Sequence, residues 1–238
     1  MLETLEKLRI IESDYKPEKR VIDALEQKQI ALVALTGPFG VGKSSCIREV
    51  VQNDDRFGRV KSFTTRERRE GEWPHQYNFQ PSSPKNLDKL LDQARHGHLL
   101  QYAVAPFNGH VYGSYLRDYN KPMMLLDALT AAIPRFKELP FKRHVNLALA
   151  AHPNDWQLTS RSRFQQLGPT ELKGRIQEGI SSLEWSLEHG DEMQWVQVEP
   201  GGVNNLANEV IGLAEGSQDP QPFSRVAGEL LLNHLKTY

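Results

Sequence analysis

The 238-residue chain has little cysteine, almost no net charge and no long apolar run. Its one cysteine, Cys46, has no partner for an internal disulfide, which points to a reducing compartment. The formal net charge of −1 provides no general attraction to nucleic acid or to an anionic membrane. No apolar run approaches the roughly 20 residues of a membrane-spanning helix, and the charged N-terminus lacks the apolar stretch of a signal peptide. These absences predict a cytoplasmic protein that binds neither membranes nor nucleic acid.

Apolar runs and amphipathic stretches alternate along the chain. Runs at residues 30–35, 123–127, 144–151 and 193–198 predict buried strands, and helices are expected over residues 43–51, 129–136 and 203–213 and from a cap at Thr170 onward. Shorter strands are expected at residues 60–63, 99–104 and 111–114, the last two joined by a hairpin turn at Asn108-Gly109. Strands that alternate with helices favour an α/β fold built on a parallel sheet.

Both ends of the chain read as additions to this core. Residues 1–29 predict a helical extension, and residues 216–238 predict a linker, GSQDPQP, followed by a helix with Phe223, Val226 and Leu230 on one side. Such apolar sides suit packing either on the core or on a second copy of the chain. A homodimer formed through the terminal helices is therefore left open.

The strongest motif is GPFGVGKS at residues 37–44, which matches the phosphate-binding pattern G-x-x-x-x-G-K-[ST] in full. Its glycines let backbone N–H groups surround a phosphate at the start of the following helix. In such loops the lysine neutralises phosphate oxygens and the serine hydroxyl is a Mg²⁺ ligand. The phosphates of a bound nucleotide are therefore assigned to Gly37, Gly40, Gly42, Lys43, Ser44 and Ser45. The motif alone leaves GTPases, ATPase motors and kinases open.

Three further segments carry a family resemblance. Residues 62–72 read SFTTRERREGE, residues 77–79 read YNF, and residues 108–114 read NGHVYGS. With the phosphate loop, they resemble the guanylate kinases, whose S-x-T-T-R-x-x-R-x-G-E, D-Y-x-F and G-x-x-Y-G-[ST] segments follow in this order. The resemblance extends from about residue 30 to residue 213 and is strongest up to Asp127. Taken alone, the RERRE run would also suit a solvated surface.

The resemblance implies a P-loop NTPase-type parallel sheet flanked by helices, within a domain of residues 30–215. It also implies a small mixed-β lobe that binds a nucleoside monophosphate, at about residues 59–120, and an arginine-bearing lid at about residues 156–170. In the family, two arginines and two tyrosines hold the acceptor's phosphate, and they match Arg66, Arg69, Tyr77 and Tyr112. Guanidinium forks and hydroxyl donors suit a dianionic phosphate.

The remaining family positions concern the metal, the transfer step and the base. Asp127 matches an aspartate that serves Mg²⁺ and the phosphates, with a helix cap for the next residues as the alternative. The lid departs from the family's R-G-R-G-T segment. Arg163 and Arg175 are expected to neutralise the transferring phosphoryl group beside Lys43 and Arg66, with surface charges as the alternative. Ser62 and Ser114 match two residues that face the base.

Two acidic residues with which the family reads guanine are missing. Gln101 stands where the family has Glu, and Leu129 stands where it has Asp. Carboxylates only accept hydrogen bonds and so suit the N1–H and N2 donors of guanine, whereas an amide offers one acceptor and one donor. A one- or two-residue slip of the alignment near Gln101 is the alternative explanation. The substitutions predict an altered preference for the base.

The sequence therefore predicts a kinase that uses ATP and Mg²⁺ to phosphorylate a nucleoside monophosphate, with GMP the first candidate. One alternative is a kinase of a phosphorylated sugar such as ribose 1,5-bisphosphate, because such enzymes share this fold and lack the two acidic residues. Another is a guanylate kinase-like binding module without activity, which takes phosphopeptides in the acceptor lobe. The intact Gly42-Lys43-Ser44 segment weighs against the module.

Overall fold

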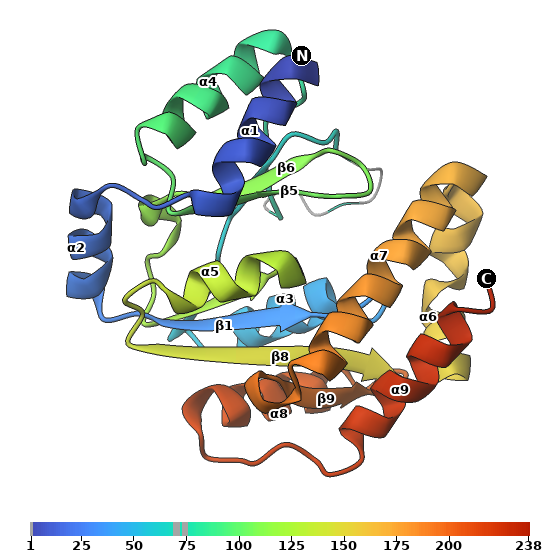
Figure 1. Cartoon of the computed structure of the whole chain (residues 1–238). Coiled ribbons are helices and arrows are strands. Elements are labelled where there is room, and N and C mark those ends of the chain that lie inside the picture. Colours follow the sequence, from blue (N-terminus) through green and yellow to red (C-terminus); the bar gives the residue numbers. More distant parts are fainter. Residues whose placement is uncertain (1, 69–71, 73–75) are drawn as a thin grey trace.

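A computed structural model describes residues 2–68, 72 and 76–238 of the chain, with the backbone only for residues 162 and 163. Figure 1 shows a large lobe around a parallel sheet and a smaller lobe above it, which contains the N-terminal helix. The helices are α1 (Leu2–Asp14), α2 (Lys19–Lys28), α3 (Lys43–Asn53), α4 (Pro84–Arg95), α5 (Ile133–Lys137), α6 (Pro153–Gln166), α7 (Pro169–Glu188), α8 (Val203–Glu215) and α9 (Ser224–Leu235). The strands are β1 (Ala31–Thr36), β2 (Phe57–Arg59), β3 (Phe63–Thr64), β4 (Asn78–Phe79), β5 (Gln101–Val104), β6 (Val111–Ser114), β7 (Met123–Asp127), β8 (Arg143–Ala151) and β9 (Gln194–Val198).

The large lobe is built on a five-stranded sheet in the order β2-β7-β1-β8-β9, in which every neighbouring pair is parallel. Every residue of β1 is buried, as its apolar sequence predicts for a central strand. Side chains of α3 and α8 pack with Val33 of this sheet, whereas those of α2 and α5 pack with Leu32, which points to the other face. The predicted α/β fold with a helix-flanked parallel sheet is thereby confirmed.

The smaller lobe contains a mixed sheet in the order β4-β3-β6-β5. Strands β5 and β6 pair antiparallel around the predicted turn, where Gly109 has φ +68°. The strand expected at residues 60–63 is correct only at Phe63, which begins β3, because residues 60–62 cross from β2 of the large sheet to β3 of the small one. This crossing places the segment that follows Ser62 in the small lobe.

Helix α4 is an element that the sequence analysis missed. It begins after Ser83, whose hydroxyl accepts a hydrogen bond from the backbone N–H of Asn86, and Pro84 occupies its first turn. Its buried side chains are Leu87, Leu90, Leu91 and Ala94. The signal was present as a serine cap, a first-turn proline and leucines at helical spacing, within an otherwise polar segment.

The N-terminal helix α1 is an integral part of the smaller lobe. Leu8 is fully buried there, and its carbonyl accepts a 2.8 Å hydrogen bond from the hydroxyl of Tyr102 in β5. Glu12, near the end of α1, accepts from the backbone N–H of Val104 at 3.0 Å and from Arg135 of the large lobe at 2.9 Å. The extension therefore packs on this chain and joins its two lobes.

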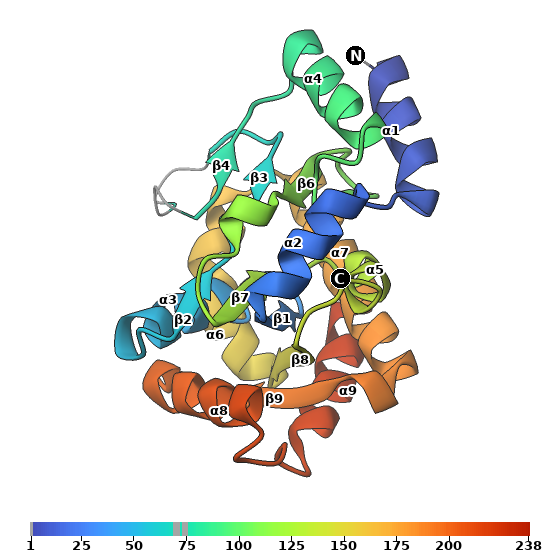
Figure 2. The ribbon, with the colours of Figure 1, turned by 90° about the vertical axis from the view of Figure 1, so that its left-hand side faces the viewer.

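Helices α6 and α7 form an arm at one side of the sheet, and α9 packs at its base against α7, β8 and β9 (Figures 1 and 2). The expected cap of α7 at Thr170 is wrong, because the helix begins at Pro169 and Gly168 precedes it as N-cap. In α9 the buried apolar residues are Ala227, Leu231, Leu232 and Leu235, whereas the side expected to be apolar, Phe223, Val226 and Leu230, is exposed. No helix of the described chain has the length and apolarity needed to cross a bilayer.

Candidate active site

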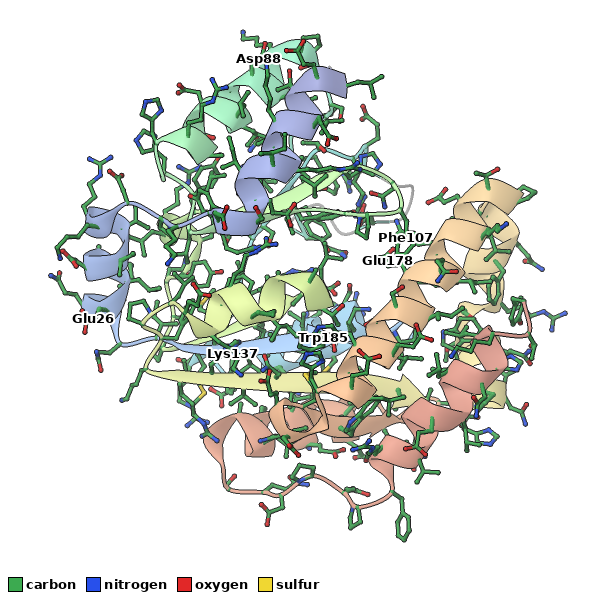
Figure 3. All side chains as sticks on the ribbon, in the orientation of Figure 1. Glu26, Asp88, Phe107, Lys137, Glu178 and Trp185 are labelled. Carbon is green, nitrogen blue, oxygen red and sulfur yellow. The ribbon has the colours of Figure 1, made fainter. Side chains whose placement is uncertain are left out.

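One cleft of about 560 Å³ lies between the large lobe, the smaller lobe and the α6–α7 arm. Phe107, beyond the end of β5, and Glu178 of α7, both labelled in Figure 3, line this cleft. The predicted site residues that also line it are Gly37, Gly40, Gly42, Lys43, Ser44, Ser45, Ser62, Arg66, Tyr77, Gln101, Tyr112, Ser114, Asp127 and Arg175. Arg69 and the side chain of Arg163 lie outside the described residues. Residues predicted from separate motifs thus meet in one cavity.

The phosphate loop connects β1 to α3 along one wall of the cleft. Its backbone depends on glycine, because Gly37 has φ +126° and a Cβ atom there would lie 2.3 Å from the carbonyl oxygen of Leu149. Gly42, with φ +105°, is the N-cap of α3 and directs that helix's N-terminus into the cleft. The Nζ atom of Lys43 donates hydrogen bonds to the carbonyls of Gly37 at 2.6 Å and Pro38 at 3.1 Å. This arrangement combines backbone N–H groups with a cation, which suits a phosphate chain.

Two oxygen-bearing side chains beside the loop suit a Mg²⁺ ion that arrives with nucleotide phosphates. Ser44 is in the first turn of α3, and its hydroxyl accepts a 3.1 Å hydrogen bond from Gln76 of the smaller lobe. Asp127 ends β7, beside β1, with its carboxylate 3.9 Å from the ammonium of Lys43. Mg²⁺ commonly takes one or two protein oxygen ligands and completes its shell with phosphates and water. The hydroxyl and the carboxylate fit that requirement.

Arg66 is the centre of the second charged part of the cleft. It is 5% exposed, and its guanidinium group pairs with both carboxylate oxygens of Glu72, one of them at 2.8 Å. The same group lies over the ring of Tyr77 at 5.0 Å, and the ring of Tyr112 lies 6.1 Å from that of Tyr77. Burial raises the pKa of Tyr77, so its phenol keeps its proton and is available as a donor. The cluster combines a guanidinium group with phenols, as a phosphate site requires.

The pairing of Glu72 with Arg66 is a feature that sequence analysis did not assign. Glu72 belongs to the G-E end of the family segment, so the signal was present without a role. In the structure its two-oxygen contact fixes the orientation of the guanidinium plane, because a fork and a carboxylate match in geometry.

The part of the cleft that the resemblance assigns to the base is lined by polar side chains on apolar walls. Gln101 and Ser114 face each other across the β5–β6 pair, and they are 5% and 1% exposed. The hydroxyls of Ser114 and Tyr119 are 3.0 Å apart, whereas the amide nitrogen of Gln101 has no hydrogen-bond partner among the described residues. Apolar lining comes from Leu126, Leu129 and Phe136. The polar groups here are thus hydroxyls and one amide.

The arm supplies the third side of the cleft. Arg175 of α7 donates a 2.9 Å hydrogen bond to Glu178, one turn further along the same helix. Its side chain is 13% exposed, so this cation is largely withdrawn from solvent. The helix places Arg175 on the same cavity as the phosphate loop.

The phosphate loop also packs directly on α6, a contact that sequence analysis did not foresee. The indole N–H of Trp156 donates a 2.8 Å hydrogen bond to the carbonyl of Phe39, and the rings of Phe39 and Phe164 are 5.5 Å apart, edge to face. Thr159 donates to the carbonyl of Gly40 at 3.3 Å. Tyr238, the last residue, stacks on Phe164 at 6.0 Å. The C-terminus and α6 therefore support the loop that would hold the donor nucleotide.

Comparisons with known proteins agree with this geometry. No protein-family model matches the chain. A guanylate kinase of Prochlorococcus marinus (strain MIT 9312) is 34% identical over 194 residues, which are 79% of this chain and 99% of that protein. A guanylate kinase of Lactococcus lactis subsp. lactis (strain IL1403) is 30% identical over 93 residues, 39% of this chain and 42% of that protein.

A solved structure of the same name shares the fold. The crystal structure of guanylate kinase from Anaplasma phagocytophilum matches with a TM-score of 0.50 and 16% identity, covering 79% of this chain and 86% of that one. At that identity the match concerns the fold alone, whereas the Prochlorococcus relative is matched over nearly its full length. The chain with this phosphate loop, this arginine cluster and this fold therefore belongs to the guanylate kinase family of nucleoside monophosphate kinases.

Proposed function

We propose that the protein transfers the γ-phosphoryl group of ATP to a nucleoside monophosphate, with GMP as the first candidate. The observation that supports this proposal is the shared cleft, in which the phosphate loop with Lys43 and the cluster of Arg66, Tyr77 and Tyr112 line one cavity. Phosphoryl transfer needs little covalent chemistry from a protein, but it needs two phosphates held in line with their charge neutralised. Two anion-binding clusters that line one cavity meet that need.

The roles of the residues follow from their positions. Lys43 and the loop N–H groups hold the β- and γ-phosphates of ATP, and Ser44 with Asp127 orients the Mg²⁺ ion that the nucleotide brings. Arg66, Tyr77 and Tyr112 hold the acceptor's phosphate, to which Arg69 is also assigned. An acceptor oxygen forms a bond to the γ-phosphorus while the bond to the β-phosphate oxygen breaks, so ADP leaves.

The lid arginines assigned to the transfer step are Arg175 and Arg163. Arg175 lines the cleft, and its charge is balanced by Glu178. It therefore stabilises the transferring phosphoryl group only through close contact, and not through a long-range charge. Closure of the arm excludes water, which would otherwise accept the phosphoryl group.

We further propose that the base pocket reads guanine less selectively than two carboxylates would. Gln101 is buried and presents an amide nitrogen without a described partner. The amide N–H group of Gln101 is a donor and suits an acceptor on the base edge, whereas guanine offers the N1–H and N2 donors at that edge. Leu129 on the same cleft offers no polar group. IMP and AMP are therefore the acceptors to compare with GMP.

The test is an assay of ADP release from Mg-ATP with a panel of acceptors. The panel contains GMP, IMP, AMP, CMP, UMP and ribose 1,5-bisphosphate, and ATP without an acceptor is the control. Turnover with a nucleoside monophosphate supports the proposal. Turnover with the sugar bisphosphate alone would replace it with the sugar-kinase alternative. No turnover with any acceptor, together with tight binding of a phosphopeptide, would replace it with the binding module.

A further inference from the structure

Arg59 is a charged cleft residue outside the motifs of the sequence analysis. It is the last residue of β2, the edge strand of the parallel sheet, and it lines the same cleft as Lys43 and Arg66. In the β2–β7 pair its partner is Leu125, two residues before Asp127. Side chains at paired positions of parallel strands point to the same face, and so do residues two apart on one strand. Arg59 therefore lies on the face of the sheet that carries Asp127.

The guanidinium group of Arg59 has donors that the described protein leaves unused. Its Nε and Nη1 atoms are buried, and neither has a hydrogen-bond partner among the described residues. Buried guanidinium N–H groups without hydrogen-bond partners are unfavourable, so their presence in a cleft points to an anionic ligand. The nearby acids are engaged elsewhere, because Glu72 pairs with Arg66 and the carboxylate of Asp127 lies 3.9 Å from the ammonium of Lys43.

The ring of Tyr77 defines where that anion would lie. The guanidinium carbon of Arg59 is 5.8 Å from the centre of this ring, and that of Arg66 is 5.0 Å from it. Two guanidinium groups thus lie beside one phenol, whose proton is retained. The charge of Arg66 is balanced by Glu72, whereas that of Arg59 is not balanced by any ion pair within the described residues. The uncompensated charge suits a dianionic phosphate.

We infer that Arg59 binds the phosphate group of the acceptor, beside Arg66 and Tyr77, and supplies the charge that Glu72 offsets at Arg66. The inference rests on the proposed function, because it concerns the acceptor of the same reaction. It makes Arg59 a binding residue that precedes the family segment by three positions, in a strand, β2, that the sequence analysis did not predict.

The experiment compares Arg59→Gln and Arg59→Lys with the unchanged protein, and Arg117→Gln serves as the control. Arg117 is exposed and lies over the ring of Tyr115 at 4.1 Å, away from the cleft. Binding of the best acceptor is measured by calorimetry, and KM values for acceptor and ATP are measured separately. Arg59→Gln is expected to weaken acceptor binding roughly tenfold to a hundredfold, as for loss of a charged hydrogen bond. The KM for ATP is expected to change less than about twofold, and Arg59→Lys is expected to be intermediate.

Measuring acceptor binding over a pH series distinguishes a charge role of Arg59 from a packing role, because packing does not depend on the charge of the acceptor's phosphate. The second pKa of a phosphate monoester is about 6, so the acceptor gains its second charge between about pH 5 and 7. The unchanged protein is expected to bind more tightly as that charge forms, and Arg59→Gln is expected to show a smaller gain. Arg117→Gln is expected to match the unchanged protein at every pH.

The outcomes separate this inference from the function on which it rests. Failure of the unchanged protein to bind any nucleoside monophosphate would overturn both. Normal acceptor binding by Arg59→Gln would overturn only the role of Arg59. A parallel loss of ATP and acceptor binding with a lowered melting temperature in both variants would make Arg59 a structural residue, and would overturn the inference. If Arg59→Gln does not fold, Arg59→Lys is the deciding variant. Unchanged acceptor binding by Arg59→Lys would reject a phosphate contact through both Nε and Nη1 of Arg59.

Discussion

The indole nitrogen of Trp156 in α6 lies 2.8 Å from the carbonyl oxygen of Phe39 in the phosphate loop, with the donor on the arm and the acceptor on the loop. The two residues are 117 positions apart in sequence. Their rings also meet edge to face at 5.6 Å. This contact makes the conformation of the loop depend on a helix that is formed by a different part of the chain.

Removing that hydrogen bond should weaken ATP binding. Trp156→Phe keeps an aromatic ring but leaves the carbonyl of Phe39 without its donor, a loss of about 1 kcal/mol or roughly fivefold in affinity. Trp185→Phe is the matched control, because Trp185 stacks on His189 at 4.1 Å and does not line the cleft. Titration of each variant with ATP measures the effect. Equal ATP affinities for the two variants would show that the contact does not support the loop.

Lys43→Ala should abolish most of the kinase activity while the fold remains. The ammonium group is 14% exposed and contacts loop carbonyls, so its removal deletes the main cation of the donor site without opening the core. Loss of such a preorganised charge costs about 100- to 1,000-fold in turnover. Turnover is compared at saturating ATP, and circular dichroism checks the fold. A Lys43→Ala variant with normal turnover would contradict the proposed mechanism.

Restoring the two acids should increase the preference for GMP. The double variant Gln101→Glu, Leu129→Asp provides acceptors for the N1–H and N2 donors of guanine, each worth about 1–3 kcal/mol when it satisfies a buried donor. The ratio of kcat/KM for GMP to that for AMP is expected to rise at least about tenfold. The two single variants show how much each substitution contributes alone and whether the two effects add. An unchanged ratio would place the base elsewhere in the cleft.

Glu12 should contribute to stability although it lies outside the expected catalytic domain. Glu12→Ala removes the acceptor of Val104 N–H and the partner of Arg135, both part-buried. A loss of about 1–3 kcal/mol in the free energy of unfolding is expected. Glu6→Ala on the same helix is the control, because the side chain of Glu6 is 65% exposed and its ion pair with Arg9 lies at the surface. Urea denaturation distinguishes the two variants, and similar unfolding free energies would refute the prediction.

Stability should fall in mild acid because of His144. Burial, followed by the charge of Lys137, lowers the pKa of His144 to about 4, and its ring nitrogens have no hydrogen-bond partner among the described residues. The unfolded chain protonates this histidine below about pH 6.5, before the folded chain does, so unfolding takes up a proton between about pH 6.5 and 4.

The expected loss over that window is about 1–2 kcal/mol after allowance for solvent screening. Above about pH 6.5 the ring is neutral in both states and contributes no pH dependence. His144→Gln removes the titrating group, so this variant should lose less unfolding free energy between pH 7 and pH 4.5 than the unchanged protein. Identical pH profiles for the two proteins would contradict the lowered pKa.

Local patterns were sufficient for most of the large lobe and for one hairpin of the smaller lobe. The apolar run MMLLD predicts β7 at the observed residues, and the Asn108-Gly109 turn predicts the β5–β6 pairing. Helix α4 was missed because its leucines lie in a polar, charged segment, so they were not recognised as one buried side of a helix. In helix α9 the sequence analysis singled out the side that is exposed, since exposed Phe223 is more hydrophobic than buried Ala227.

The site was predictable where a short motif carries the chemistry. Residues of the phosphate loop and of the T-T-R segment were named from sequence and line the cleft together. Arg59 was not named, because a single arginine at the end of a strand carries no motif. Its relation to Tyr77 depends on the pairing of β2 with β7 and on the crossing from β2 to β3.

The sequence by itself determined the four longer strands of the large sheet, the phosphate loop and the family, because each depends on residues that are close together along the chain. Glycines at required backbone angles and runs of apolar residues act locally and leave a readable pattern. Only the tertiary structure decided which charges are balanced, namely Arg66 by Glu72 and not Arg59, and which helix supports the loop. Those outcomes depend on distances between segments that meet only after folding, where burial makes an unpaired charge costly and a paired one acceptable.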